Sequence, residues 1–162
     1  MAKVPVKLII EGFMDESGKD REREVTSITY SLNQTVDKDG QVTDVPRGGL
    51  IVMRMKALNK YNAKLFDWMC DKSRVEKGKI LFHDTTTGVI MKTIWFEDAY
   101  CVNYVEHWSD DTAGVDIAHW EEITISCRII SQEGITHVNG WNSIRGKQFR
   151  EGDGKPEWDD DF

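Results

Sequence analysis

A regular alternation of apolar and polar side chains along residues 119–131, HWEEITISCRIIS, is the feature that most restricts how this chain folds. The apolar members of the alternation are Ile123, Ile125, Cys127 and Ile129, and the polar members between them are Thr124, Ser126 and Arg128. Successive side chains of a β-strand point to opposite faces, so one face of this segment is apolar throughout. The pattern predicts a strand with one face in the core and the other more polar.

Other segments have the same strand-like character. Residues 4–12 form a short apolar strand, the alternation from 28 to 33 predicts a second, and LIVMRMKA at 50–57 predicts a third. From 77 to 108 the sequence predicts a strand, a hairpin turn at Gly88, a strand, a short corner and another strand. The charged stretch 14–24, MDESGKDRERE, is expected to be the turn between the first two strands.

One segment has the period of a helix instead. The apolar residues that recur there at intervals of three and four are Leu58, Tyr61, Leu65, Trp68 and Met69. Asn59 is placed as an N-cap, and the helix is expected to end near Lys72. Because Leu65, Trp68 and Met69 form one apolar stripe, we expect them to anchor the helix to the rest of the fold.

Short strands separated by turns, with a single amphipathic helix, predict a mainly β fold. The expected form is an antiparallel β-barrel, or a sandwich of two packed sheets, with the helix plugging or flanking it. A chain of 162 residues, 40% of them hydrophobic, is long enough to bury one full core. We expect one domain over 1–141, followed by a polar, acidic C-terminal extension over 142–162, where the periodicity is lost.

Charge and hydropathy argue against several classes of partner. The net charge is −7, and the Lys and Arg residues form no cluster of the kind that binds phosphates, so nucleic acid is not an expected partner. The apolar run near the N-terminus meets Glu11 too early for a signal peptide, and no later run approaches the length of a membrane span. We expect a cytoplasmic protein without membrane contact, whose export would need no N-terminal signal.

The adjacent acids Glu97 and Asp98, in the stretch FEDAYCVNY, raise the question of a catalytic carboxylate pair. Such a pair must face one pocket, whereas neighbouring residues of a strand point to opposite faces. The favoured interpretation is therefore a corner between two strands, in which Asp98 accepts hydrogen bonds from nearby backbone N–H groups.

No catalytic, metal or cofactor site is predicted. His83 is followed by Asp84 as in half of a triad, but no nucleophile lies in a G-x-S-x-G turn, and no nucleotide-binding glycine motif is present. No two of the four histidines have the H-x-x-x-H spacing that is typical of metal ligands on a helix. They are His83, His107, His119 and His137. The three cysteines, Cys70, Cys101 and Cys127, lack a C-x-x-C pair and are expected to be buried free thiols.

The fold alone does not account for a long polar loop and a surplus of aromatic residues. The stretch QTVDKDGQVTDVPRGG, 34–49, is longer than a hairpin needs, and is either functional or a disordered insertion. Trp108, Trp120 and Trp141 fall at predicted strand or loop ends. They either close the core or anchor an interface, since both uses bury the same ring.

A series of motifs in a fixed order resembles a known family. YSLNQ is followed by RGG before a strand, LFDWM on the helix, FEDAYCVNY, and GITHVNGW near the end. Together they resemble the tube proteins of Bacteroidetes-type type VI secretion systems, the TssD branch of the haemolysin-coregulated (Hcp) proteins. The resemblance covers roughly residues 3–141. It implies a barrel with one helix, without catalysis, that forms hexameric rings stacked into a tube inside a contractile sheath.

The same resemblance implies partners and a site. The tube would contact the sheath, a spike protein and baseplate components, would carry effector proteins in its lumen, and would be secreted through the apparatus. The family places an extended loop on the ring face, so the loop here is expected to be the ring-stacking element. Its residues are Val36, Asp37, Lys38, Asp39, Gly40, Gln41, Val42, Thr43, Asp44 and Val45.

Two features depart from the family pattern: the extension 142–162 and the long charged turn at 14–24. The extension leaves open whether the chain is a plain tube subunit or a specialised variant. A rival hypothesis is a small-molecule-binding barrel of the lipocalin type, which needs a cavity where the predicted inward residues are large. A further rival, a metal-dependent hydrolase, would be identified by bound zinc or iron.

Overall fold

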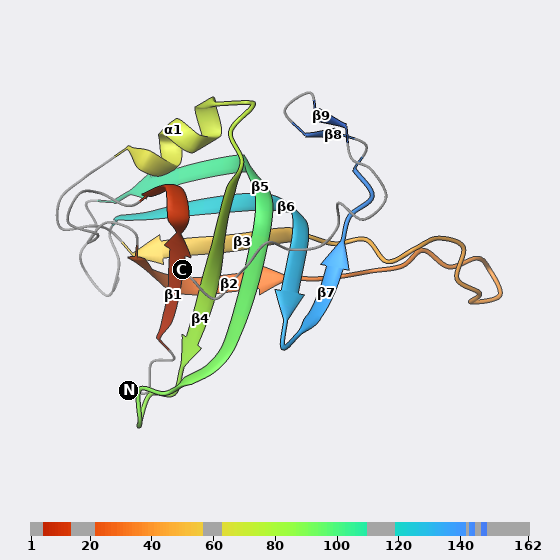
Figure 1. Cartoon of the computed structure of the whole chain (residues 1–162). Helices are drawn as coiled ribbons and strands as arrows, with labels where there is room; N and C mark the ends of the chain where they lie inside the picture. Colours follow the sequence, from red (N-terminus) through yellow and green to blue (C-terminus); the bar gives the residue numbers. More distant parts are fainter. Residues whose placement is uncertain are drawn as a thin grey trace.

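A computed structural model describes residues 5–13, 22–56, 63–109, 119–141, 143–144 and 147–148. The strands are β1 (Val6–Ile10), β2 (Glu22–Tyr30), β3 (Leu50–Lys56), β4 (Glu76–His83), β5 (Ile90–Trp108), β6 (His119–Gln132), β7 (Ile135–Val138), β8 (Ser143–Ile144) and β9 (Lys147–Gln148). A 3-10 turn, η1 (Glu11–Phe13), follows β1, and the helix α1 (Lys64–Cys70) lies between β3 and β4 in the sequence (Figure 1).

β8 and β9 form a separate pair, and the other strands form one antiparallel sheet that closes on itself. Its order is β3-β2-β1-β4-β5-β6-β7, and an additional pairing of β3 with β6 closes the barrel. The pairing with β3 uses β6 from Trp120 to Ser126, whereas β7 pairs with β6 from Ile129 to Gln132. The predicted antiparallel barrel with one helix is confirmed, as one closed sheet rather than two packed ones.

The alternating residues of the strands form the core. Ile123, Ile125 and Cys127 are fully buried in the core, as the alternation in the sequence predicts. The alternation ends there, because residues 127–131 are all buried and Ile130, instead of the predicted Ile129, joins the core cluster. From the adjacent strand β3, which pairs with β6, the side chains of Ile51, Met53 and Met55 are also fully buried. The inward positions are thus occupied by large apolar side chains, consistent with a small barrel that is filled by its own residues.

The helix contacts the barrel through part of the predicted stripe. Leu65 and Trp68 are each 1% exposed and belong to the core, where the Trp68 ring meets Phe13 edge-on at a centroid distance of 5.8 Å. Met69 is 36% exposed and does not belong to the buried set, because the described helix is short and Met69 lies on its margin. The expected N-cap at Asn59 falls within 57–62, outside the described residues.

The expected corner at Glu97 and Asp98 is a bulge within one long strand. β5 continues without interruption from Ile90 to Trp108. Its pairing with β4 shifts between Phe96↔Gly78 and Ala99↔Glu76, so two residues of β5 face one of β4, and Asp98 adopts a φ of 51°. The Asp98 carboxylate accepts hydrogen bonds from Nε and Nη2 of Arg128, each at 2.7 Å, in place of the expected backbone contacts.

The first predicted turn is shorter than expected. β2 begins at Glu22, so the end of the charged stretch 14–24 belongs to the barrel wall, while 14–21 lie outside the described residues. In β2, the Arg23 side chain points inward and is only 4% exposed. The charged residues around Arg23 thus predict a turn, whereas Arg23 occupies a buried position in a strand.

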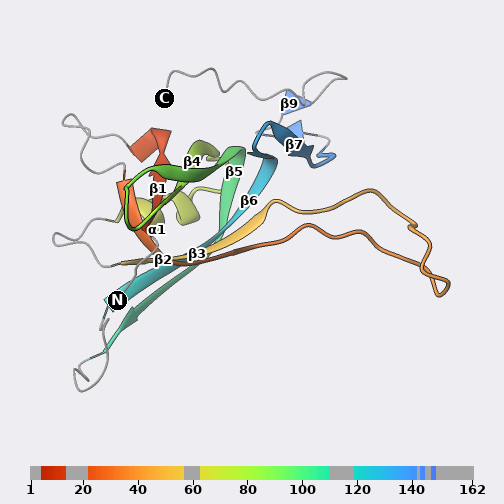
Figure 2. The ribbon, with the colours of Figure 1, turned by 90° about the horizontal axis from the view of Figure 1, so that it is seen from below.

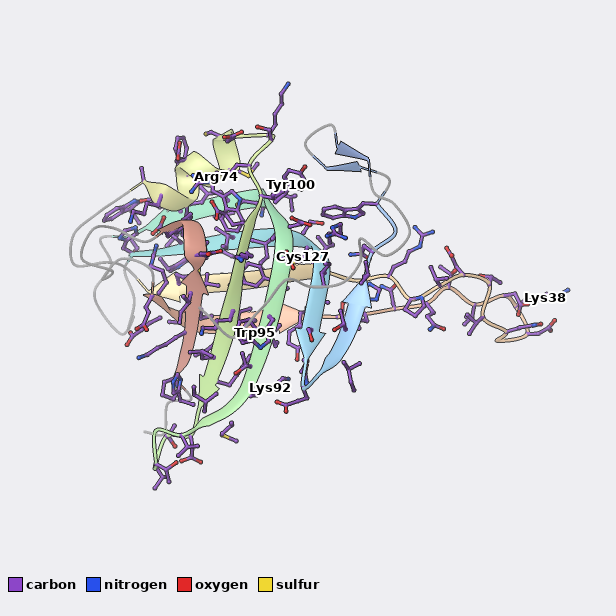
Figure 3. All side chains as sticks on the ribbon, in the orientation of Figure 1. Lys38, Arg74, Lys92, Trp95, Tyr100 and Cys127 are labelled. Atoms are coloured by element: carbon purple, nitrogen blue, oxygen red, sulfur yellow. The ribbon has the colours of Figure 1, made fainter. Side chains whose placement is uncertain are left out.

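Between β2 and β3 the chain leaves the barrel as a narrow ribbon, which we call the arm (31–49). The arm continues the direction of β2 and β3 and projects well beyond the barrel in two perpendicular views (Figures 1 and 2). Lys38 lies near its far end, whereas Cys127 lies in the barrel (Figure 3). The long loop of the sequence is thus an extended hairpin whose two legs run side by side.

Candidate assembly arm and its support

The far end of the arm is a turn closed by its own polar groups. The Asp37 N–H donates to the Gln41 carbonyl at 2.9 Å, and Gly40 N–H donates to the Asp37 carbonyl at 3.0 Å. The Asp37 carboxylate accepts from the N–H groups of Asp39 and Gln41, each at 2.9 Å. Gly40 has a φ of +83°, a conformation that glycine adopts without steric cost. The predicted stacking residues therefore have a defined shape before any partner binds.

The two legs of the arm are joined by a few contacts along its length. Asn33 and Arg47 exchange backbone hydrogen bonds of 2.8 and 2.7 Å, and the hydroxyls of Thr35 and Thr43 lie 3.0 Å apart. Near the base, Arg47 Nε donates to Asp44 at 3.1 Å. The backbone N–H of Val45, followed by Arg47, holds the pKa of Asp44 below its usual value, so this carboxylate stays charged.

The base of the arm is fixed to the barrel by Asn139. Its Nδ2 donates to the carbonyls of Gly48 at 2.7 Å and Cys127 at 2.8 Å, and its Oδ1 lies 2.9 Å from His137 Nε2. Gly49 has a φ of +89°, and a Cβ there would lie 2.4 Å from the Cys127 carbonyl oxygen. Only glycine fits this close approach. The RGG and GITHVNGW motifs of the sequence thus meet at one point, a contact that sequence reasoning missed.

Several valines make the outer arm apolar as well as charged. Val36 and Val42 face each other across the two legs in an isolated bridge. Val36, Val42 and Val45 are 59%, 52% and 67% exposed. A monomer leaves these side chains in water, although burying each would be favourable. The arm therefore has both apolar and charged groups available for contact with another surface.

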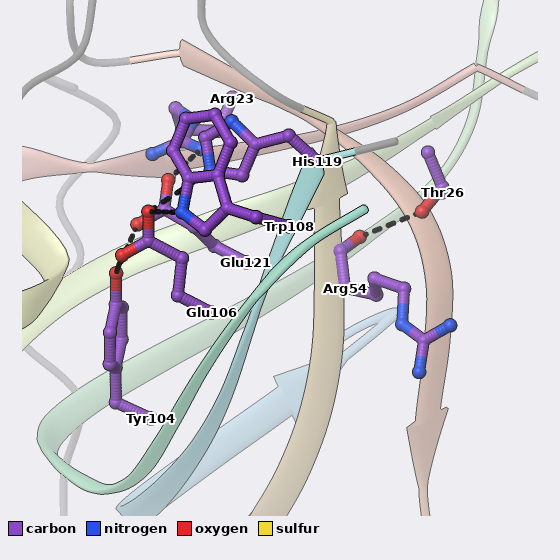
Figure 4. A network of polar contacts seen from close by, with 8 residues as sticks. All are labelled: Arg23, Thr26, Arg54, Tyr104, Glu106, Trp108, His119 and Glu121. Atoms are coloured by element: carbon purple, nitrogen blue, oxygen red, sulfur yellow. Dashed lines mark hydrogen bonds and ion pairs between the residues drawn. The ribbon is translucent and has the colours of Figure 1, made fainter. Parts of the chain in front are cut away.

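A buried polar network lies near the start of β2, whereas the arm follows the end of this strand. Figure 4 shows the network from close by. Arg23 Nη2 and Glu121 Oε1 form an ion pair of 2.9 Å, with side chains only 4% and 3% exposed. The Tyr104 hydroxyl donates to Glu121 at 2.7 Å and also lies 3.0 Å from Glu106. Burial, followed by the hydrogen bond to Glu121, raises the pKa of the Tyr104 phenol far above its usual value. The carboxylates of Glu121 and Glu106 thus both accept hydrogen bonds from neighbouring side chains, which is typical of structural ion pairs.

The other predicted polar and aromatic residues have local partners. The Asp84 carboxylate accepts from the N–H groups of Thr87 and Thr86, which lowers the pKa of Asp84, so it supports a turn rather than a triad with His83. Trp108 is 64% exposed and stacks on His119, and the stacked pair His107 and Trp120 lies on the neighbouring rung. Within the described part of the chain, no cluster of potential metal ligands is found.

The cysteines differ in their surroundings. Cys101 and Cys127 are buried, and burial raises the pKa of the Cys101 thiol to about 11 and also raises that of Cys127, so both remain thiols at neutral pH. Cys70 is exposed on α1, so the expectation that all three are buried is wrong. It lies on the face of the helix that turns away from the core.

A closed antiparallel barrel with one short helix and a supported arm defines the chain as a β-barrel protein with a projecting hairpin. The model of the family described as Hemolysin coregulated protein Hcp (TssD) matches residues 2–142. The chain therefore belongs to the Hcp (TssD) family, the type VI secretion tube proteins. None of the curated proteins matches the sequence.

Solved structures of Hcp proteins have a similar fold. Hcp1 from Flavobacterium johnsoniae is similar at 25% identity and a TM-score of 0.71, with 83% of this chain and 99% of that chain covered. Hcp1 from the E. coli EAEC 042 pathovar has 16% identity and a TM-score of 0.63, covering 86% and 99%. Hcp1 from Salmonella typhimurium has 18% identity and a TM-score of 0.62, covering 85% and 92%. The Flavobacterium structure also supports the predicted Bacteroidetes-type branch.

In the described residues, no helix has the length and apolar character needed to cross a membrane. The Hcp family is a family of secreted structural tube proteins, and this chain matches it over the whole barrel.

Proposed function

We propose that this chain is a non-catalytic subunit that closes into hexameric rings, and that the arm joins each ring to the next in the tube. The observation that carries the proposal is the arm itself: it projects beyond the barrel and yet is shaped by its own hydrogen bonds. An element that is already ordered loses less conformational freedom on binding than a disordered loop.

The chemistry of the arm suits a contact between rings. Asp37, Lys38 and Asp39 give its far end mixed charge, which favours a specific but salt-sensitive contact. Val36 and Val42 add apolar surface directly behind these charges. Mixed polar and apolar surface of this kind is typical of protein interfaces.

The proposal includes the setting of the tube. Rings assemble in the cytoplasm inside a contractile sheath, beneath a spike protein and on a baseplate, and leave the cell through the apparatus with effector proteins in the lumen. Residues 142–162 form an extension of the tube domain 1–141, and the described part of this extension pairs β8 with β9. No nucleic acid, membrane or cofactor takes part.

Replacing residues 37–44 with a short Gly-Ser linker tests the assignment of the arm. The shortened protein should form rings with the mass of the unmodified rings in light scattering, because the barrel is unchanged. Negative-stain microscopy should show no tubes, and the cells should export little of the protein. The proposal for the arm is wrong if tubes and export persist at the normal level, and a monomeric unmodified protein would contradict the whole assembly.

A further inference from the structure

The β4–β5 hairpin carries an exposed apolar tip, Val89, Ile90 and Met91. These consecutive residues are 62%, 50% and 66% exposed. The loop before them is held in place: Asp84 N–H donates to the Val89 carbonyl at 2.8 Å, Gly88 N–H donates to the Asp84 carbonyl at 2.9 Å, and Gly88 has a φ of +71°. The apolar tip is therefore a shaped projection of the barrel.

The surroundings of the apolar tip resemble the centre of an interface. Residues 85–91, TTTGVIM, are all exposed and contain no charged side chain, in a protein where 30% of the residues are charged. Centres of interfaces are depleted of charged residues. A run of exposed apolar residues on an ordered hairpin is unfavourable in water unless another surface covers it.

A groove of about 430 Å³ lies between the base of the arm and the β6–β7 hairpin. We call it the arm-base groove, and its apolar lining includes Tyr30, Leu32, Gly49, Ile130 and Ile135. It exists because β3 pairs with β6 only as far as Ser126, so the sheet opens where β7 takes over. Among the described lining residues, Glu133 is the only carboxylate, and none is a Lys or an Arg.

The apolar tip extends past the point where β5 meets the arm-base groove. At that point Ile94 pairs with Gln132, and Lys92 Nζ donates to the Tyr30 hydroxyl at 2.6 Å. In Figures 1 and 2 the β4–β5 turn is separated from the arm and β7, so the tip of one chain does not enter its own groove. When one molecule carries a projection and a matching recess at different places, copies associate in a heterologous contact that closes into a ring or extends as a filament. Membership of a tube-forming family makes a second copy the expected occupant.

We propose that the apolar tip of one subunit fills the arm-base groove of the neighbouring subunit in the same ring. The proposal rests on the proposed ring assembly and names its lateral contact. Met91 and its neighbours lie against Leu32 and Ile135, which are 53% and 80% exposed in the monomer. The arm stays free for the next ring, because its outer residues lie far from the groove.

A charge exchange tests the contact by its effect on molecular mass in light scattering. Met91→Glu should shift the protein from the ring to the monomer, because its carboxylate enters an apolar groove whose lining already includes Glu133. Ile135→Lys should do the same, because its ammonium meets an apolar tip without a charged side chain. The double variant should regain rings, because the introduced ammonium of one subunit meets the introduced carboxylate of the next. Val102→Glu, on β5 at 46% exposure and outside both surfaces, is the matched control and should keep the ring.

A cross-link decides the pairing directly. In a Cys70→Ser background, which removes the exposed thiol, a mixture of Met91→Cys and Ile135→Cys chains should form a disulfide-linked dimer on oxidation. A mixture of Met91→Cys and Val102→Cys chains should not. If Met91→Glu keeps full ring mass, or if the first mixture links no more than the second, this inference is overturned while the ring proposal stands. A monomeric unmodified protein would overturn the ring proposal itself.

Discussion

β2 and β3 each pass from the barrel wall into the arm, and the two parts of each strand are stabilised differently. In the wall, Val25, Met53 and Met55 are buried and their strands pair along ladders of several residues, with one bulge between Val25 and Ser27. In the arm, pairing is reduced to two isolated bridges, Asn33↔Arg47 and Val36↔Val42, and nearly every residue is exposed. Burial holds the wall, whereas local hydrogen bonds hold the arm, so the arm can change with little effect on folding.

The largest effect is expected from the buried ion pair of the wall. Glu121→Ala removes the carboxylate that faces the buried Arg23 guanidinium, and breaking such a pair costs about 3–5 kcal/mol. Urea unfolding should show this loss in the free energy of unfolding. Glu121→Gln, which keeps the shape and can still accept a hydrogen bond from Tyr104, should lose less. Equal stability of Glu121→Ala and the unmodified protein would show that the pair does not support the wall.

A smaller loss is expected from the helix contact. Leu65→Ala leaves a cavity under α1 and should cost about 2–5 kcal/mol, with a lower melting temperature. Met69→Ala, from the same turn region but 36% exposed, is the matched control and should change stability much less. Similar losses in the two variants would mean that both side chains contribute to the helix contact.

The smallest effect on folding is expected in the arm. Asp37→Ala removes the carboxylate that accepts from Asp39 and Gln41, yet all three residues are exposed and remote from the core. Its free energy of unfolding should remain within about 0.5 kcal/mol of the original value. Amide hydrogen exchange should nevertheless become faster at Gln41, because its N–H loses an acceptor. A destabilisation comparable to that of Leu65→Ala would remove the distinction between arm and wall.

Period-two alternation predicted the barrel wall well because it records directly which face is buried. It found the positions of β3 and β6 and the inward residues Ile123, Ile125 and Cys127. It failed at Arg23, since the partner Glu121 lies 98 residues away and an isolated charge in a charged run looks solvated. It also failed at Asp98, where the strand has a bulge instead of the predicted corner. A bulge depends on how β5 pairs with β4, and the sequence of β5 alone does not show this pairing.

The candidate site was predictable in place but not in form. The length and polarity of 36–45 marked an unusual loop, and the family resemblance gave it a role, which stays a prediction. The sequence did not predict that the loop is a hairpin held by hydrogen bonds between its two legs. These bonds join residues that are apart in the sequence, such as Thr35 and Thr43, so no local pattern indicates them. The support by Asn139 was not predictable, since it depends on a contact between residues 91 positions apart.

The direct continuation of β2 and β3 into the arm has a mechanical consequence. A pull along the arm acts parallel to both strands, and the hydrogen bonds of an antiparallel ladder lie perpendicular to the strands. The ladder of β3 with β6, from Leu50↔Ser126 to Lys56↔Trp120, is therefore loaded in shear, with its rungs sharing the force instead of opening one after another. An arm attached in this way transmits axial tension into the barrel wall without peeling the wall apart.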